Sequence, residues 1–181
     1  MVAIEGVAFT IGAVVSETIA AWLAASGAQR DITLWAEPFG ADWEAMWTAC
    51  PRADWLIALA VRRGAEVALI AAAARSVATL ALDHVDDEER ARLVAALADP
   101  TAQRASAIEA LAERSRDPAH QAALMAVALA TRGAREDAAM VPAFVVQAAA
   151  MDAADCGMSA AVSYAQRRGA ELVREIIPRA P

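Results

Sequence analysis

The sequence predicts an all-α fold, a compact bundle of about eight alanine-rich helices with no substantial sheet. Capping residues, prolines and glycines divide the chain at helix-length intervals. Between them, apolar residues recur with helical spacing, and 52 of the 181 residues are alanine, the strongest helix former. The alternation typical of strands is absent after residue 15, with only weak candidates within residues 2–15.

The first elements follow from their end signals. A helix is expected to start near Ser16, a suitable cap, and to end at Gly27. A short helix starts at Asp42 and ends before Pro51, because the residue preceding a proline avoids the helical region. Pro51 then suits the first position of a further helix that ends at Gly64.

The segment from Ala65 to about His84 is predicted to be a central helix. Only a few of its side chains are polar, and four of these fall at spacings of three and four. They form one narrow stripe, so the rest of the helix surface can be buried. The stripe consists of Arg75, Ser76, Thr79 and Asp83.

Three further helices begin at acidic caps. Asp86, with Glu89 three residues on, resembles a capping box. Asp99 and Asp117 each precede a proline, as at an N-cap followed by the first helical position. The helix after Asp117 is almost wholly apolar over residues 121–131 and is expected to be buried.

Two helices complete the chain. Residues 136–153 are nearly uniformly apolar, and Pro142 lies either in the first turns of this helix or at a kink. Residues 159–178 form an amphipathic helix, supported by the spacing of Arg167 and Glu171.

We expect one helical domain over residues 1–181, in which a tryptophan-rich part, residues 1–64, packs on an alanine-rich bundle, residues 65–181. Small side chains allow helix axes to approach closely. Large side chains fill the irregular gaps that remain, and we expect most of the indoles to be buried. The chain has five tryptophans: Trp22, Trp35, Trp43, Trp47 and Trp55.

Charge limits the classes of partner. The net charge is −7, there is no lysine and no basic run occurs, so nucleic-acid binding is not expected. An acidic surface favours association with basic proteins, although moderate negative charge also serves solubility. The apolar segments are interrupted by charged residues, and the N-terminal one lacks a basic start and carries Glu5. These features favour a cytoplasmic protein without a membrane partner.

No pattern of reactive residues predicts an enzyme. Cys50 and Cys156 are expected to be free, buried thiols. His84 lies in an acidic turn that could hold a divalent cation, but a solvated turn that caps the next helix explains it better. The acidic residues of the turn are Asp83, Asp86, Asp87 and Glu88. Neither a metal nor another cofactor is expected, and no glycine-rich phosphate loop is present.

Candidate binding residues lie in two places. Trp43, Trp47, Arg52 and Asp54 combine residue types that dominate interface hot spots, although tryptophans four residues apart are also typical of a core. Asp54 is expected to pair with Arg52 or with a distant arginine such as Arg75. The acidic turn, Asp83 with Asp86, Asp87 and Glu88, is the second candidate surface.

The segment "AMWTACPRADWLIALAVRRG" resembles a family of small helical bacterial immunity proteins associated with polymorphic toxin systems. The pattern W-x-x-C-P-R-x-D-W-L-x-x-L-A carries the resemblance over about 20 residues, through Trp47, Cys50, Pro51, Arg52, Asp54, Trp55, Leu56, Leu59 and Ala60. It implies a helical fold and a role in binding a toxin.

The expected function is therefore non-enzymatic protein binding, as an immunity-like inhibitor of a basic toxin domain. Two alternatives remain. A self-associating scaffold would form a homo-oligomer, and a small-ligand carrier would hold its ligand in an apolar pocket between alanine-lined helices.

Overall fold

A computed structural model of the chain describes residues 17–153 and 157–181, and all regular structure in these ranges is helical. The predicted all-α class is confirmed. The described ranges contain eleven α-helices and two 3-10 segments, more than the eight or so predicted. The weak strand candidates at residues 2–15 and the cap at Ser16 lie outside the described residues, as does Cys156.

The chain divides into two compact units, residues 1–42 and 43–181. The boundary differs from residue 64, at which the sequence separated a tryptophan-rich part from an alanine-rich bundle. The segment that resembles immunity proteins therefore belongs to the larger unit, together with the bundle. The expected packing of residues 1–64 on the rest stays a prediction.

The smaller unit is a short helical hairpin closed by a backbone hydrogen bond. The side chain of Thr18 accepts from the N–H of Ala21 at 3.2 Å and caps the first helix. The Ile19 N–H donates to the Gly40 carbonyl at 2.7 Å, which joins the two ends of the unit. Its elements are α1 (Ile19–Ala25), α2 (Arg30–Ala36) and η1 (Glu37–Phe39).

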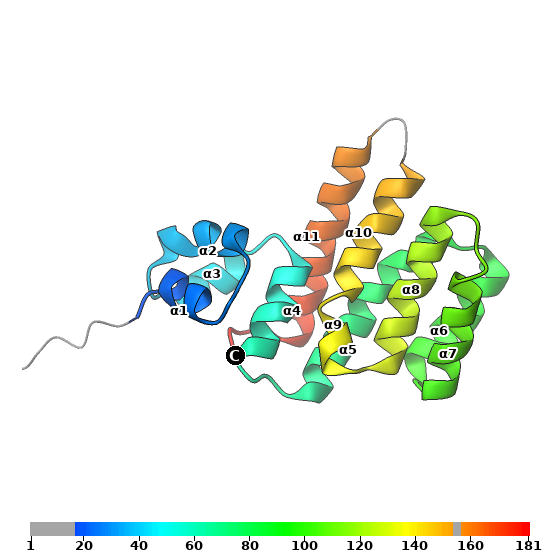
Figure 1. The fold of residues 1–181 in the computed structure, drawn as a ribbon, viewed down its shortest axis with the longest axis horizontal. Helices are drawn as coiled ribbons and strands as arrows, with labels where there is room; N and C mark the ends of the chain where they lie inside the picture. Colours follow the sequence, from blue (N-terminus) through cyan, green and yellow to red (C-terminus); the bar gives the residue numbers. More distant parts are fainter. Residues whose placement is uncertain (1–16, 154–156) are drawn as a thin grey trace, which may run out of the picture. The chain divides into compact units, whose positions relative to one another are not determined.

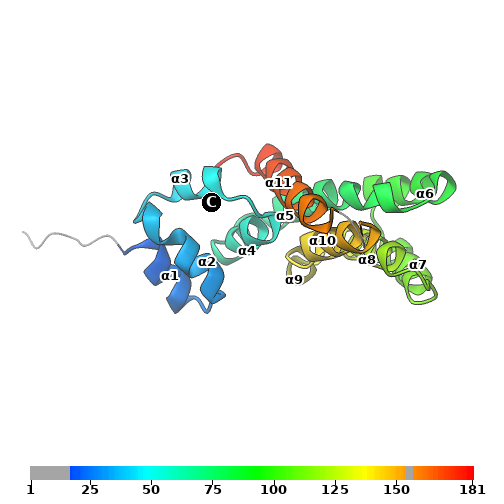
Figure 2. The same ribbon diagram turned by 90° about the horizontal axis from the view of Figure 1, so that it is seen from above.

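The larger unit is built around α8 and α5. Figure 1 shows α8 between α7 and α10, with α11 beside α10, and the same neighbours are in contact. Figure 2 shows the same unit from above, and α5 packs against α8, α10 and α11. The elements are α3 (Trp43–Ala49), α4 (Ala53–Arg62), α5 (Val67–Ala78), η2 (Thr79–His84), α6 (Asp87–Ala98), α7 (Ala102–Ala112), α8 (Pro118–Arg132), α9 (Arg135–Ala138), α10 (Val141–Asp152) and α11 (Met158–Ile176).

The two helices predicted to be central occupy central positions. In α8 ten of fifteen side chains are buried, and Asp117 caps it by accepting from the N–H of Ala119 at 2.9 Å. The segment Val67–His84 comprises α5 and its 3-10 extension η2, and its polar stripe is partly or fully exposed. Among the described residues this segment alone is long and apolar enough to cross a membrane, a test that buried core helices also pass.

Two predicted helix starts are displaced by two residues. Pro51 precedes the N-cap of α4, which is Arg52, instead of opening the helix. The start of α7 is capped by Thr101, whose hydroxyl accepts from the Arg104 N–H at 3.2 Å. Asp99 lies two residues before this cap, and its carboxylate accepts from the Arg104 guanidinium at 2.7 Å.

Helices α4 and α11 approach closely because their contact residues are small. A Cβ atom built on Gly169 of α11 would lie 3.0 Å from the Cβ of Ala53 and 3.6 Å from a methyl group of Val77. A helix carrying a larger residue at this position would have to move away from its neighbours. The alanine-rich composition thus permits short distances between helix axes, as the sequence predicted.

Gly169→Val should lower the free energy of unfolding by about 2 kcal/mol or more, because the added side chain overpacks the contact with α4. Arg167→Val places the same residue on an exposed part of α11 and should cost about 0.5 kcal/mol of helix propensity. Urea unfolding measures both. Ala53→Gly should recover part of the loss at Gly169, and equal losses at positions 169 and 167 would contradict the close approach.

Candidate partner-binding surfaces

Arg52 organises the junction between α3 and α4. Its guanidinium donates two hydrogen bonds to Asp54, from Nε to Oδ1 at 3.1 Å and from a terminal nitrogen to Oδ2 at 2.6 Å. The same group lies over the indole of Trp55, with Cζ 4.4 Å from the ring centroid. A planar guanidinium suits both contacts at once. The predicted pairing of Asp54 with Arg52 is confirmed, and both side chains remain partly exposed.

The end of α11 holds this junction through four residues that we call the C-terminal clasp: Trp47, Cys50, Arg174 and Ile177. The Trp47 indole N–H donates to the Ile177 carbonyl at 3.1 Å. Arg174 donates to the carbonyls of Cys50 at 2.7 Å and Trp47 at 3.5 Å. The indole of Trp47 is 1% exposed, so it forms part of the core and offers no surface to a partner in this conformation.

The other tryptophans differ in burial. Trp55 is buried, as predicted. Trp43 is half-buried, and the guanidinium of Arg63 lies over its ring at 4.0 Å from the centroid. Trp22 and Trp35 are also only half-buried, which differs from the expectation that they lie largely inside. Of the first set of candidate binding residues, Trp43, Arg52 and Asp54 therefore keep some accessible surface.

Cys50 is a buried and unreactive thiol. Its side chain has no exposed surface, and this desolvation raises the pKa of the thiol from 9.0 to about 11. The thiolate is the reactive form, so a raised pKa disfavours nucleophilic chemistry at neutral pH. The other cysteine, Cys156, lies outside the described residues.

The acidic turn before α6 uses its carboxylates in different ways. Asp86 caps α6 by accepting from the backbone N–H three residues on at 2.8 Å. Glu88 pairs with Arg92 on the same helix at 3.2 Å, with both side chains well exposed. Asp83 and Asp87 are exposed, and within the described ranges neither has a hydrogen bond or ion pair. The turn thus presents two carboxylates directly to solvent.

A pocket of about 190 Å³ opens beside this turn, between η2, α10 and α11. Its floor is aliphatic, and its polar lining consists of Asp83, His84, Asp152 and Tyr164. The Nδ1 atom of His84 lies 3.2 Å from a carboxylate oxygen of Asp152. The fold therefore adds Asp152 and Tyr164, which the sequence analysis did not select, to the predicted acidic turn.

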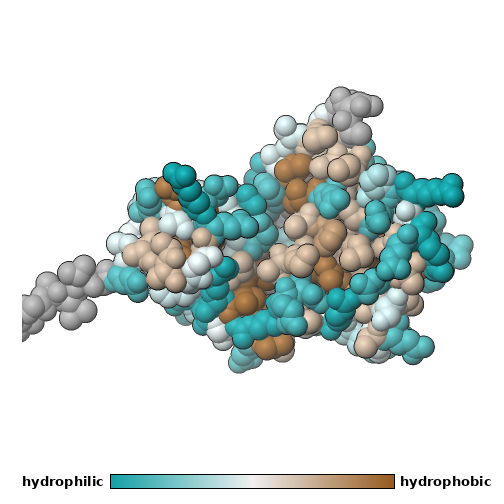
Figure 3. Space-filling view, viewed as in Figure 1, coloured by the Kyte–Doolittle hydropathy of each residue, from teal (hydrophilic) through white to brown (hydrophobic). Residues whose placement is uncertain are grey.

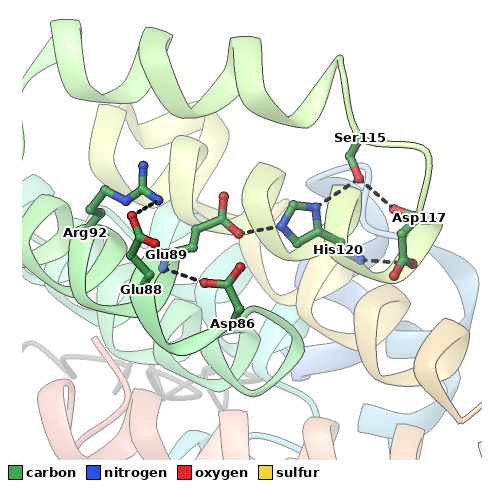
Figure 4. A network of polar contacts seen from close by, with 7 residues as sticks. All are labelled: Asp86, Glu88, Glu89, Arg92, Ser115, Asp117 and His120. Carbon is green, nitrogen blue, oxygen red and sulfur yellow. Dashed lines mark hydrogen bonds and ion pairs between the residues drawn. The ribbon is translucent and has the colours of Figure 1, made fainter.

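Glu89, His120 and Ser115 form a polar chain between α6 and the start of α8 (Figure 4). The Glu89 carboxylate lies 2.5 Å from Nε2 of His120, and Nδ1 of His120 lies 2.9 Å from the Ser115 hydroxyl. The hydroxyl in turn donates to the Asp117 carbonyl at 3.2 Å. The Glu89 and His120 side chains are only 12% and 29% exposed, so the contact is largely shielded from water.

Ser115, His120 and Glu89 are the residue types of a Ser-His-acid catalytic triad. Their geometry suits a structural link between helices better than catalysis. A nucleophilic serine must give its proton to the histidine. Here the Ser115 hydroxyl contacts both Nδ1 of His120, at 2.9 Å, and the Asp117 carbonyl, at 3.2 Å, so the carbonyl competes with His120 for the single hydroxyl proton. The nearby N–H groups of Ala119 and His120, which could have stabilised an oxyanion, donate to the Asp117 carboxylate.

A second depression, of about 400 Å³, lies between α6 and α7. Its lining is almost wholly apolar and includes Leu93, Ile108 and Leu111. Arg92 and Arg104 also line the groove. Arg92 is paired with Glu88, and Arg104 is paired with Asp99. This groove is the candidate site for the alternative function, the carriage of a small ligand in an apolar pocket between helices.

Within the described residues no group of three His, Cys, Asp or Glu side chains could hold a metal ion. No protein-family model, curated protein or solved structure matches the chain. The residues that carry the resemblance to immunity proteins lie in the structure at the α3–α4 junction and along α4.

Stability should fall between pH 9 and 11 through Cys50. The folded-state pKa of about 11 lies above the unfolded value of about 9, so the contribution is complete below pH 9 and is lost as pH rises. The loss should amount to about 2–3 kcal/mol, from about 1.4 kcal/mol per pH unit. Urea unfolding across this range should show the slope, and Cys50→Ala should lack it. Parallel curves for the two proteins would contradict the assignment.

His120→Ala should destabilise the protein by about 1–3 kcal/mol, because it leaves a mostly buried carboxylate on Glu89 without its partner. Hydrogen exchange should accelerate more in α6 than in α10. In the Glu89→Ala, His120→Ala double variant the loss should be smaller than the sum of the two single losses. Arg92→Ala, on the exposed face of α6, is the control. Strict additivity would show that the two side chains do not interact.

Proposed function

We propose that the protein is a cytoplasmic, non-enzymatic binding protein that covers a basic surface of a protein partner, as an immunity protein covers a toxin domain. The observation that carries the proposal is the group of exposed carboxylates around the pocket: Asp83 and Asp87 without partners among the described residues, and Asp152 with its side chain 66% exposed. The net charge of −7 acts in the same direction.

The placement of the other reactive groups supports binding over catalysis. Ser115, His120 and Glu89 join α6 to the start of α8, and the Asp117 carbonyl competes with His120 for the Ser115 proton. Cys50 is enclosed and its pKa is raised, which keeps the thiol protonated. In contrast, the carboxylates around the pocket are held on helices and reach solvent. Fixed charges of one sign on a rigid surface attract a complementary partner from a distance and raise its association rate.

The groove between α6 and α7 favours a second function, the carriage of a small apolar ligand. Its volume of about 400 Å³ falls in the range of small-molecule sites, and its walls are aliphatic. An apolar ligand that co-purifies with the protein and is displaced by Leu111→Arg, a change at a groove residue that is 37% exposed, would support this alternative. That result would be independent of the charged surface.

The test compares two variants of equal charge. One carries Asp83→Asn, Asp87→Asn and Asp152→Asn, and the other carries neutral substitutions at three exposed acids elsewhere: Glu17→Gln, Asp31→Asn and Glu66→Gln. A partner captured by the native protein should be lost with the first variant and retained with the second. Light scattering on the free protein shows whether the partner is a second copy of the chain.

The association rate with the purified partner should fall at least tenfold between about 50 and 500 mM NaCl, because salt screens the attraction between exposed charges. Surface plasmon resonance measures this rate. A partner whose association rate is insensitive to salt, or equal losses with both triple variants, would rule out the acidic surface as the binding site.

A further inference from the structure

The pocket between η2, α10 and α11 contains more than a cluster of acids. Its aliphatic floor includes Leu80 and Val145, and its rim carries the ring of Tyr164, which is 61% exposed. Two carboxylates, those of Asp83 and Asp152, stand at the same opening. No arginine is among the described residues that line it, so its charge is negative.

The pocket also contains a hydrogen-bonding atom that the fold leaves unused. Nδ1 of His84 is buried and makes no hydrogen bond to any described residue. Its distance of 3.2 Å from the Asp152 carboxylate is short enough for an ion pair, but the alignment is too poor for a hydrogen bond. Whichever ring nitrogen carries the proton, a buried ring nitrogen without a hydrogen bond costs free energy.

The exposed carboxylate at this opening fits one particular group. Asp152, with its side chain 66% exposed, can accept two parallel N–H bonds from a guanidinium. An ammonium presents a point charge without this fork geometry. The aliphatic floor can hold the methylene stem, and the Tyr164 ring can lie against the cation.

The size of the pocket restricts its occupant further. A volume of about 190 Å³ holds one long side chain and is too small for a helix or an acyl chain of full length. Figure 3 shows apolar surface over parts of α10 and α11. On these two helices Met151 and Met158 are 47% and 46% exposed. Methionine and tyrosine are enriched at protein interfaces.

We infer that this pocket receives a single arginine side chain from the basic surface of the partner. The inference rests on the proposed function and names the contact through which the partner is recognised. The guanidinium binds the Asp152 carboxylate, Asp83 adds long-range attraction, and the Tyr164 ring packs against the stem.

The experiment uses a model of the arginine side chain as the probe. N-acetyl-L-arginine methylamide is titrated into the full-length protein, and the ring resonances of His84 and Tyr164 are followed by NMR. We expect saturable shifts with a Kd on the order of 1–10 mM, reasonable for one exposed ion pair and a few apolar contacts. N-acetyl-L-citrulline methylamide has the same shape without the charge and should bind at least fivefold more weakly.

Variants locate the site. Asp152→Asn should weaken probe binding at least threefold, whereas Glu66→Gln, a control that removes an equal charge away from the pocket and the acidic turn, should change it less than twofold. Both side chains are exposed, so neither change should prevent folding. Equal binding of the arginine and citrulline probes, equal effects of the two variants, or shifts that do not saturate would each overturn the inference.

Probe binding and partner capture test two different claims, the arginine site and the proposed function. Probe binding at the pocket in a protein that captures no basic partner would support the arginine site and count against the proposed function. Capture of a basic partner by a protein that does not bind the probe would overturn the arginine site and leave the proposed function in place.

Discussion

The larger unit depends on the C-terminal clasp, in which Trp47 and Cys50 are bound to Ile177 and Arg174 across about 125 residues of chain. These hydrogen bonds attach the first helix of the unit to the last. They also fix where α4 begins, because Arg52 must reach both Asp54 and the face of Trp55. Once α4 starts at Ala53, that residue meets Gly169, and the close packing of α4 on α11 follows. A carbonyl released from the clasp would lose its donor in a largely buried position.

Packing differs between the two ends of this unit. Around the clasp, alanine and glycine let helices approach to van der Waals distance. At the far end, α6 has a groove of about 400 Å³ on its α7 side and a shallower one of about 270 Å³ on its α5 side. Its attachment relies on a few apolar residues, such as Leu93, and on the contact between Glu89 and His120. Sites that exchange partners or ligands are commonly drawn from such less stable regions of a fold.

Local patterns in the sequence predicted the features that depend on residues close together along the chain. The helical class, the caps at Asp86 and Asp117 and the pairing of Arg52 with Asp54 all depend on residues within a few positions of one another. The cap of α7 was predicted wrongly at Asp99, since the hydroxyl of Thr101, two residues further on, accepts the helix N–H instead. An Asp-Pro pattern alone does not reveal such a shift.

The contacts that define the candidate site could not be predicted in this way. Glu89 meets His120 from 31 positions away, and Asp152 meets His84 from the end of a different helix. Each is an ordinary surface residue when read along its own helix. Only the packing of α6 and α10 on α8 and η2 brings them together, and helix packing depends on side-chain shapes that hydrophobic spacing does not encode.

Several polar groups of the segment from Trp47 to Ala60 are satisfied within the fold. Trp47 and Cys50 form part of the clasp, and Arg52 is held by Asp54 and Trp55. Side chains whose polar groups are already satisfied internally have little left to offer a partner. These residues therefore serve to join helices in this fold. The pocket lined by Asp83, His84, Asp152 and Tyr164 is a place in this unit where exposed carboxylates and a buried ring nitrogen without a hydrogen bond coincide.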